Sequence, residues 1–477
     1  MLFNSLEFLI FLPFVFLCYW YLFSKNKSTQ NIFLLFSSYV FYAFWDWRFL
    51  FLLLFSTGID YFLGILINNS DVENKRKWLL RLSVFIKILI LCYFKYADFF
   101  VNSFIEFFYN LGIKIKPFEL NILLPIGISF YTFHGISYLT DIFYNRIKPV
   151  KSYIEYSLFV SYFPLLVAGP IERATHLLPQ LYKKRKFNYK QSISGLQLML
   201  WGMFKKVVVA DSLANIVNNA FTKYEQYNGI SLIVGVISLS FLIYGDFSGY
   251  SDIARGVSKL FGIELLKNFN LPYFSRSIGE YWSRWHISLS SWLNDYVFTP
   301  LALKFRNWGK LGVYLAIFIT FLISGFWHGP AWHYVAQGFL FSIYYIPIVF
   351  SKKRIKLIEY NKDSTFSFLD VFKIVRTYIM VCIGYVYFRA ESLQHAWNYL
   401  TTILSSLYHN PYQLLSLPEG WECILIIAPI IIGDLMIRKY KTFENIPVFL
   451  KYCSYLILGL AIFFCFDKKT SFVYFQF

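Results

Sequence analysis

The chain has 477 residues, of which 57% are hydrophobic and 15% are charged, whereas a soluble domain has about 25% charged residues. Its 45 lysines and arginines exceed its 27 acidic residues, which gives a formal net charge of +18. The basic residues cluster in short loops between apolar runs, which is typical of cytoplasmic membrane loops rather than a nucleic-acid surface. These features exclude an ordinary soluble domain and predict an all-α polytopic membrane protein. They predict contact with membrane lipid and no nucleic-acid partner.

Apolar runs long enough to cross a bilayer recur along the chain and predict about 11–13 membrane segments. The first run, Leu6–Phe23, has no basic n-region and no small-residue cleavage site, so it predicts a retained helix and not a signal peptide. Pro125, Gly127 and Gly135 punctuate the run Leu123–Phe143, which predicts a broken or re-entrant helix. The other predicted segments are Asn31–Trp45, Arg48–Ile67, Trp78–Phe94, Glu155–Ala168, Gln191–Ala210, Ile230–Tyr244, Gly312–Trp327, Trp332–Phe350, Asp370–Phe388, Cys423–Met436 and Val448–Phe466.

The loops indicate an orientation, because basic loops stay on the cytoplasmic side. The predicted cytoplasmic loops are "SKNKSTQ", "DVENKRK", "YKKRKFNYK", "SKKRIK" and "RKYK". The loop "YHNPYQLLSLPEGWE" lacks lysine and arginine and is predicted to lie on the outer face.

A polar stretch, Tyr244–Leu301, lies between two hydrophobic spans. Within it, apolar side chains recur at a spacing of three and four residues, which predicts one amphipathic helix: Trp282, Trp285, Leu289, Trp292 and Tyr296. The opposite face of that helix carries Arg284, Ser288, Ser291 and Asp295. Such a helix caps a polar cavity or serves only as a peripheral anchor at the interface.

Two histidines lie in "FLISGFWHGPAWHYVAQG". His328 ends an apolar run, and the Gly329-Pro330 pair that follows breaks the helix and frees backbone polar groups. An ionisable side chain at membrane depth usually faces a cavity, and histidine is a general base near neutral pH. The alternative for His328 is an interfacial histidine bound to a backbone carbonyl. His333 is interpreted as structural.

Other ionisable residues lie near apolar runs or helix breaks and are weaker candidates. His286, in "RWHISLSSW", is either catalytic or a surface residue of the amphipathic helix. His134 is interpreted as a packing or tunnel-lining residue. The charged residues Glu172, Arg173, Asp246 and Asp252 are predicted to form structural pairs around a polar site.

Several kinds of chemistry have no support in the sequence. It contains no HExxH or CxxC pattern, so no metal site is predicted. It also contains no GxSxG, P-loop or GxGxxG motif, so neither a serine hydrolase nor a nucleotide hydrolase is indicated.

Five stretches together resemble the membrane-bound O-acyltransferases, in particular their bacterial alginate, peptidoglycan and teichoic-acid branch. These stretches are "PIGISFYTFHGISYLTD", "VAGPIER", the segment from "DFSGYSDIARG" to "YVFTPL", "SGFWHGPAWHYVAQG" and the terminal "FVYFQF". The resemblance implies a helical bundle around a central funnel or tunnel. It implies a single domain over residues 1–477, with N-terminal helices at 1–120, a catalytic core at 121–350 and C-terminal helices at 351–477.

The resemblance also implies an activity and a site. His328 would be the catalytic histidine and His286 the second histidine, with Ser324 and Trp327 as possible oxyanion donors. No cofactor is expected to stay bound, and acetyl-CoA would be the acyl donor. The partner would be a separate periplasmic O-acetyltransferase of the SGNH type, and the location the bacterial inner membrane.

The implied reaction is O-acetylation of an extracytoplasmic polysaccharide. A composition typical of an A/T-rich genome favours peptidoglycan, since alginate producers generally have G/C-rich genomes. Alginate or another exopolysaccharide is the alternative acceptor. A proton-coupled transporter, with His328, Asp246 and Glu172 as a relay, and a non-catalytic scaffold also remain open.

Overall fold

The computed structural model describes residues 1–114, 120, 122–167, 169–351, 367–409, 421–440 and 446–466. These residues form helices and no strand, so the all-α prediction is confirmed. They divide into two compact units: unit 1 spans Met1–Met199 and Ser251–Leu266, and unit 2 spans Leu200–Tyr250 and Lys267–Phe477. The predicted "SKKRIK" loop after its first residue, most of the predicted outer loop and the terminal "FVYFQF" lie outside the described residues.

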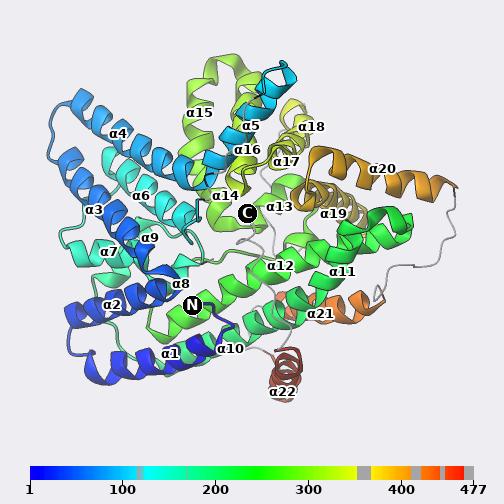
Figure 1. Cartoon of the computed structure of the whole chain (residues 1–477). Helices are drawn as coiled ribbons and strands as arrows, with labels where there is room; N and C mark the ends of the chain where they lie inside the picture. The colour runs from blue at the N-terminus through cyan, green and yellow to red at the C-terminus, as the bar shows by residue number, and fades with distance from the viewer. Residues whose placement is uncertain are drawn as a thin grey trace. The chain divides into compact units, whose positions relative to one another are not determined.

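Unit 1 begins with the first apolar helix, which continues from α1 (Leu6–Leu17) into a π-helical segment, Cys18–Leu22. Within this unit α3, α4 and α6 pack side by side (Figure 1). The other helices of the unit are α2 (Lys27–Asp46), α3 (Arg48–Asn68), α4 (Glu73–Leu91), α5 (Ala97–Asn110), α6 (Ile128–Phe143), α7 (Tyr153–Ser161), α8 (Phe163–Leu166), α9 (Ala174–Leu181) and most of α10 (Tyr189–Met203).

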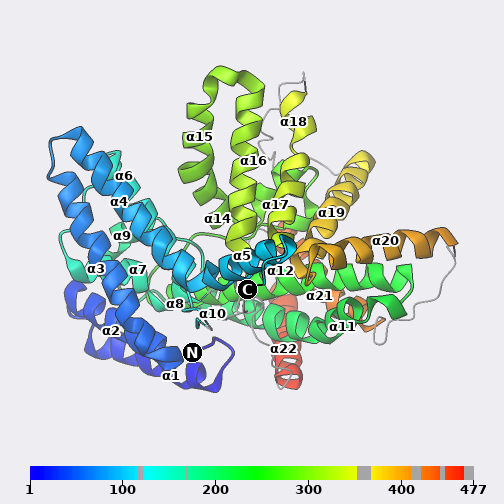
Figure 2. The same ribbon diagram turned by 45° about the horizontal axis from the view of Figure 1, so that its top comes forward.

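Unit 2 holds the C-terminal half of the chain and most of the long helix α12 (Gly229–Leu260). In this unit α16, α17 and α19 lie together (Figure 2). Its remaining helices are α11 (Asp211–Thr222), α13 (Ile278–Arg284), α14 (Ile287–Leu293), α15 (Thr299–Lys304), α16 (Gly309–His328), α17 (Trp332–Ile343), α18 (Ile346–Phe350), α19 (Phe368–Arg389), α20 (Leu393–His409), α21 (Glu422–Tyr440) and α22 (Val448–Cys465).

Seven of the described helices are long and apolar enough to cross a membrane: Arg48–Asn68, Tyr189–Thr222, Gly229–Leu260, Arg306–His328, Trp332–Phe350, Phe368–Arg389 and Val448–Cys465. The number is below the 11–13 segments predicted, because several apolar runs form shorter or more charged helices. For example, α6 has 16 residues, and α4 begins with the charged sequence "ENKRK".

The predicted single span Glu155–Ala168 is wrong over its described part. It forms two short helices, α7 and α8, with Tyr162 in a non-helical conformation between them. Pro164 accounts for the break, since a proline has no amide hydrogen and its ring collides with the carbonyl four residues earlier. The run Leu123–Phe143 fits the prediction of a broken helix: its described residues are irregular up to Gly127 and helical from Ile128.

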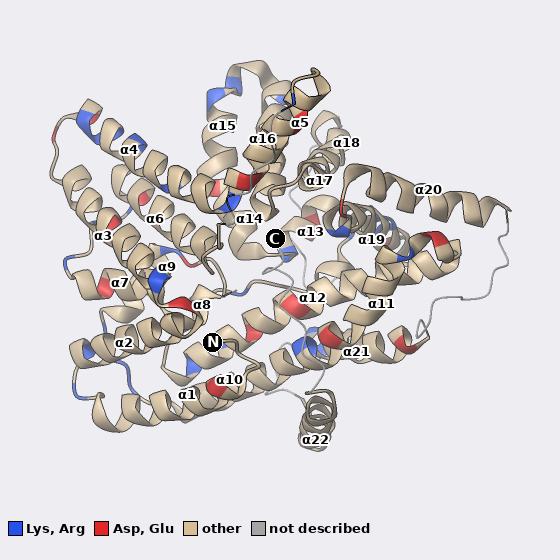
Figure 3. Cartoon of the chain, in the orientation of Figure 1, with Lys and Arg blue, Asp and Glu red and all other residues tan. Residues whose placement is uncertain are grey.

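Helices α16 and α17 approach each other closely. A Cβ on Gly325 would overlap the carbonyl oxygen of Tyr334, and a Cβ on Gly338 would overlap that of Phe321. Small residues of this kind let helix backbones pack tightly in membranes. The sequence of α17 contains no Lys, Arg, Asp or Glu, and Figure 3 marks the acidic and basic residues on the other helices. Packing rather than charge therefore joins the two helices.

Candidate active site

His328 is the last residue of α16. Gly329 follows in an extended conformation, since a residue that precedes proline is kept out of the helical region. A Cβ on Gly329 would overlap the ring of Tyr334, so glycine lets the chain turn closely into α17. The predicted helix break is therefore present, and it leaves His328 half-buried at a helix end.

The indole of Trp327 contacts both candidate histidines. Its ring centroid lies 5.0 Å from that of His328 and 6.2 Å from that of His286. Phe388 of α19 lies 5.4 Å from the ring of His328, and Trp327 itself is buried. Unit 2 thus brings together three of the predicted site residues, whose catalytic roles stay predictions.

The predicted single amphipathic helix is wrong. The chain forms two short helices, α13 and α14, and His286 lies between them with a φ of 43°. A non-glycine residue in this left-handed region cannot continue an α-helix. The supposed polar face is only partly solvated, because Arg284 and Ser288 are 6% and 1% exposed whereas Asp295 is exposed.

The break at His286 is stabilised by hydrogen bonds from an earlier segment. The amide of Asn270 donates to the carbonyl of Arg284 at 2.9 Å, and the amide of Ile287 donates to the carbonyl of Asn268 at 2.8 Å. The side-chain oxygen of Asn268 also accepts the hydroxyl of Ser288 at 2.9 Å. These bonds satisfy backbone groups on both sides of His286, so the interrupted helix leaves them paired.

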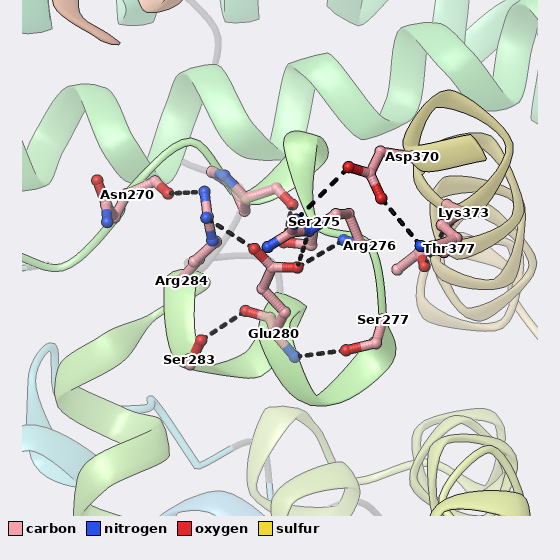
Figure 4. A network of polar contacts seen from close by, with 11 residues as sticks. Asn270, Ser275, Arg276, Ser277, Glu280, Ser283, Arg284, Asp370, Lys373 and Thr377 are labelled. Carbon is pink, nitrogen blue, oxygen red and sulfur yellow. Dashed lines mark hydrogen bonds and ion pairs between the residues drawn. The ribbon is translucent and has the colours of Figure 1, made fainter. Parts of the chain in front are cut away.

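A buried ion-pair network extends from α13 (Figure 4). Glu280 forms an ion pair with Arg284 at 2.7 Å and accepts the amide of Arg276 at 2.8 Å. Arg276 in turn lies 3.6 Å from the carboxylate of Asp370 on α19. The predicted site residue Arg284 is therefore tied to its own helix through Glu280, and α13 is tied to α19 through Arg276.

The surroundings of His286 favour its neutral form. Burial lowers the pKa of His286 to about 3, because a low-dielectric environment disfavours the charged imidazolium. The rings of Phe247 and Phe269 lie 6.2 and 6.1 Å away. A neutral imidazole offers one donor and one acceptor nitrogen. This suits a residue that orients a reacting group or relays a proton.

Ser324 lies four residues before His328 on α16 and is buried. Residues at this spacing share one face of a helix. The hydroxyl is therefore on the same side of α16 as the imidazole, and its role as an oxyanion donor stays a prediction.

The predicted carboxylates of the polar stretch lie in separate environments. Asp246, in α12, is fully buried and forms an ion pair of 2.7 Å with Lys206, which also contacts Asp211 at 2.9 Å. Asp252 pairs with Arg255 one turn later at 3.2 Å. Asp295 is exposed. The structure thus gives Asp246 and Asp252 paired roles, as predicted, and places Asp295 at the surface.

His134 and Glu172 belong to a buried cluster in unit 1. The imidazole of His134 accepts the backbone amide of Glu172 at 3.2 Å. The Glu172 carboxylate binds His176 at 2.7 Å and the amide of Leu266 at 2.6 Å. The hydrogen bond with the Glu172 carboxylate raises the pKa of His176. Glu172 thus has His176 as its ion-pair partner, a residue without an assigned role in the sequence. Arg173, beside Glu172, is half-buried.

Two lysines that are buried in the structure were not predicted from the sequence. Lys206 joins Asp211 and Asp246 in unit 2, and Lys87 pairs with Asp60 at 2.7 Å in unit 1. The available signal was a charged residue inside an apolar run, which usually has a partner at membrane depth. No cluster of three or more metal-ligating side chains occurs among the described residues.

Comparison with known proteins adds the family. A sequence model of the membrane-bound O-acyltransferase family matches residues 90–389. The chain is 37% identical to the probable alginate O-acetylase of Pseudomonas aeruginosa, over 94% of this chain and 83% of that protein. It is 34% identical to the peptidoglycan O-acetyltransferase of Helicobacter pylori, over 83% and 78% of the two chains. The teichoic acid D-alanyltransferase of Bacillus subtilis is 27% identical over 58% of this chain and 71% of its own length.

The family match covers the candidate site in full, from the polar stretch through "FWHG" to Phe388. The apolar helices and the bacterial relatives agree with the predicted multi-pass location in the inner membrane. The chain belongs to the membrane-bound O-acyltransferase family and is an acyltransferase of the membrane.

Proposed function

We propose that this protein transfers an acetyl group from cytoplasmic acetyl-CoA toward an extracytoplasmic polysaccharide. The observation that carries the proposal is the position of His328, at a broken end of an apolar helix and in contact with Trp327. Two relatives that cover most of this chain are named for O-acetylation of a polysaccharide or glycan.

The chemistry follows from the residues around His328. The acceptor hydroxyl attacks the thioester carbonyl, and the imidazole of His328 takes the hydroxyl proton as general base. A tetrahedral oxyanion forms and is stabilised by hydrogen-bond donors. The buried hydroxyl of Ser324, on the same side of α16, is the proposed donor. The intermediate then expels the CoA thiolate, which recovers the proton, and the acetyl ester remains on the acceptor.

His286 supports this step as a neutral residue. Burial keeps its imidazole uncharged near pH 7, and the Trp327 ring is a contact that His286 and His328 share. We therefore assign His286 the orientation of the acceptor or of the thioester.

The acceptor is a hydroxyl on cell-wall peptidoglycan or on a separate periplasmic O-acetyltransferase of the SGNH type that completes the transfer. Alginate is the second candidate polysaccharide, and it is favoured by the relative of 37% identity. The composition typical of an A/T-rich genome supports peptidoglycan.

The test measures ester-linked acetate on isolated cell wall and on secreted polysaccharide in a deletion strain. The strain is complemented with the wild type, His328→Ala or the control His409→Ala, which changes an exposed histidine at the end of α20. Loss of cell-wall acetate with His328→Ala alone is the expected result. Loss only from the secreted polymer would identify the alginate-type alternative, and full acetate with His328→Ala would favour a scaffold. Unchanged acetyl-CoA consumption by membranes of the deletion strain would favour a transporter.

A further inference from the structure

Unit 1 contains a cavity of about 420 Å³. The residues that line it are distant in sequence from His286 and His328, which belong to unit 2. It forms where the π-helical end of the first apolar helix meets the basic segment 184–187. Its aromatic walls are Phe16, Trp20, Tyr21 and Phe187. Trp20 donates its indole hydrogen to the carbonyl of Leu260 at 2.9 Å, so this wall is fixed in place.

Arg185 lines the cavity and is 5% exposed. Its Nε donates to the hydroxyl of Tyr19 at 2.5 Å, and its Nη2 donates to the side-chain oxygen of Asn31 at 2.7 Å. Both acceptors are neutral, and no carboxylate among the described residues forms an ion pair with this guanidinium. The remaining nitrogen, Nη1, is buried without a hydrogen-bond partner in the described part of the chain.

An unpaired nitrogen on a buried cation is costly. A guanidinium keeps its charge in proteins, and a buried charge is normally compensated by an anion. The backbone around Arg185 is also fixed: Gln30 accepts its amide at 2.9 Å and donates to its carbonyl at 3.0 Å. The chain thus fixes a guanidinium charge, without a carboxylate partner among the described residues, in the wall of the cavity, where a bound anion would stabilise it.

The rim of the cavity identifies the kind of anion. Lys184 and Lys186 are exposed there, in the predicted cytoplasmic loop "YKKRKFNYK". Tyr21 and Phe187 are 81% and 51% exposed, and aromatic rings at the end of an apolar helix are typical of the membrane interface. Phosphate geometry suits the arginine fork, and anionic lipids are enriched in the cytoplasmic leaflet.

We propose that this cavity binds the phosphate headgroup of an anionic phospholipid from the cytoplasmic leaflet. Arg185 contributes its positive charge in the cavity wall, Lys184 and Lys186 contribute charge at the rim, and the aromatic walls contact the glycerol and the first carbons of the acyl chains. The site is independent of the acyl-transfer reaction proposed above.

The experiment uses the purified full chain in detergent and titrates phosphatidylglycerol or phosphatidylcholine, with bound lipid counted by native mass spectrometry. The rim variant Lys184→Gln/Lys186→Gln is compared with Lys183→Gln/Lys190→Gln. The control removes the same charge from exposed positions of the same loop that do not line the cavity. We expect phosphatidylglycerol to bind the wild type and the control alike, and the rim variant about 30-fold more weakly.

A second variant separates charge from geometry. Arg185→Lys keeps the charge but loses the fork that binds both Tyr19 and Asn31 and fixes the charge in the cavity wall, so we expect weaker binding than in the control. Equal binding by the rim and control variants, or equal binding of the two lipids, would overturn the proposal. Displacement of the lipid by equimolar inorganic phosphate or CoA would also overturn it and would assign the cavity to a soluble phosphate ester.

Discussion

His328 and His286 contact the same indole, yet the chain positions them in different ways. His328 occupies the end of an apolar helix, where the adjacent Gly329-Pro330 pair breaks the chain. His286 lies at a left-handed position held by Asn268 and Asn270, which are distant in sequence. The first histidine is half-buried, and the second is almost fully buried. A local motif therefore sets one position, and long-range hydrogen bonds set the other.

The largest effect is expected at His328. His328→Ala removes the general base, and acetyl-CoA turnover by the purified protein should fall about 10²–10⁴-fold. The exposed histidine variant His409→Ala should keep the wild-type rate. A His328→Ala protein that folds and turns over acetyl-CoA within threefold of the wild type would contradict the assignment of His328 as the general base.

The next effect concerns the network behind His286. Glu280→Gln leaves the buried guanidinium of Arg284 without its carboxylate, and breaking one side of a buried pair costs about 3–5 kcal/mol of folding free energy. The thermal midpoint of the purified protein should fall accordingly. Asp295→Asn changes an exposed carboxylate of the same stretch and should shift the free energy of unfolding by less than about 0.5 kcal/mol. Equal midpoints for the two variants would mean that the network does not stabilise α13.

A pH series then tests the burial of His286 through the stability of the protein. The folded-state pKa of His286, about 3, lies below the unfolded value of about 6.5. The unfolded chain therefore binds the extra proton first, and stability falls as the pH is lowered from about 6.5 toward 3. At pH 5 the loss from this group is about 2 kcal/mol.

The variant His286→Asn tests the sign. Asparagine tolerates the left-handed conformation but does not titrate, so its thermal midpoint should depend less on pH between 7 and 5 than that of the wild type. The exposed histidine variant His409→Ala should keep the wild-type slope. An identical slope for His286→Asn would show that His286 is not the buried neutral group that it is here taken to be.

The smallest effect is expected at Ser324. Ser324→Ala removes one hydroxyl next to the reacting group and leaves His328 in place. Loss of a single oxyanion donor lowers kcat by about 10²–10³-fold where the donor is essential; because backbone amides at the helix break offer further donors, we expect about tenfold here. An unchanged kcat would assign the oxyanion to other donors and would restrict the role of α16 to His328.

Much of the fold was predictable from local sequence. The apolar runs predicted the long helices, and Gly329-Pro330 predicted the end of α16. Other predictions were wrong where distant residues decide. The spacing of Trp282, Trp285 and Leu289 indicates one helix, but the backbone bonds of Asn268 and Asn270 stabilise a break that no periodicity reveals.

The sequence alone determined the membrane class, the helical content and His328 as the candidate base, because hydrophobic periodicity and a proline act over a few residues. Only the tertiary structure decided that His286 is buried and neutral, that Glu280 pairs with Arg284, and that the buried Arg185 lines a cavity. Burial and the pairing of charges depend on side chains brought together from distant parts of the chain, and these forces act through space rather than along the sequence.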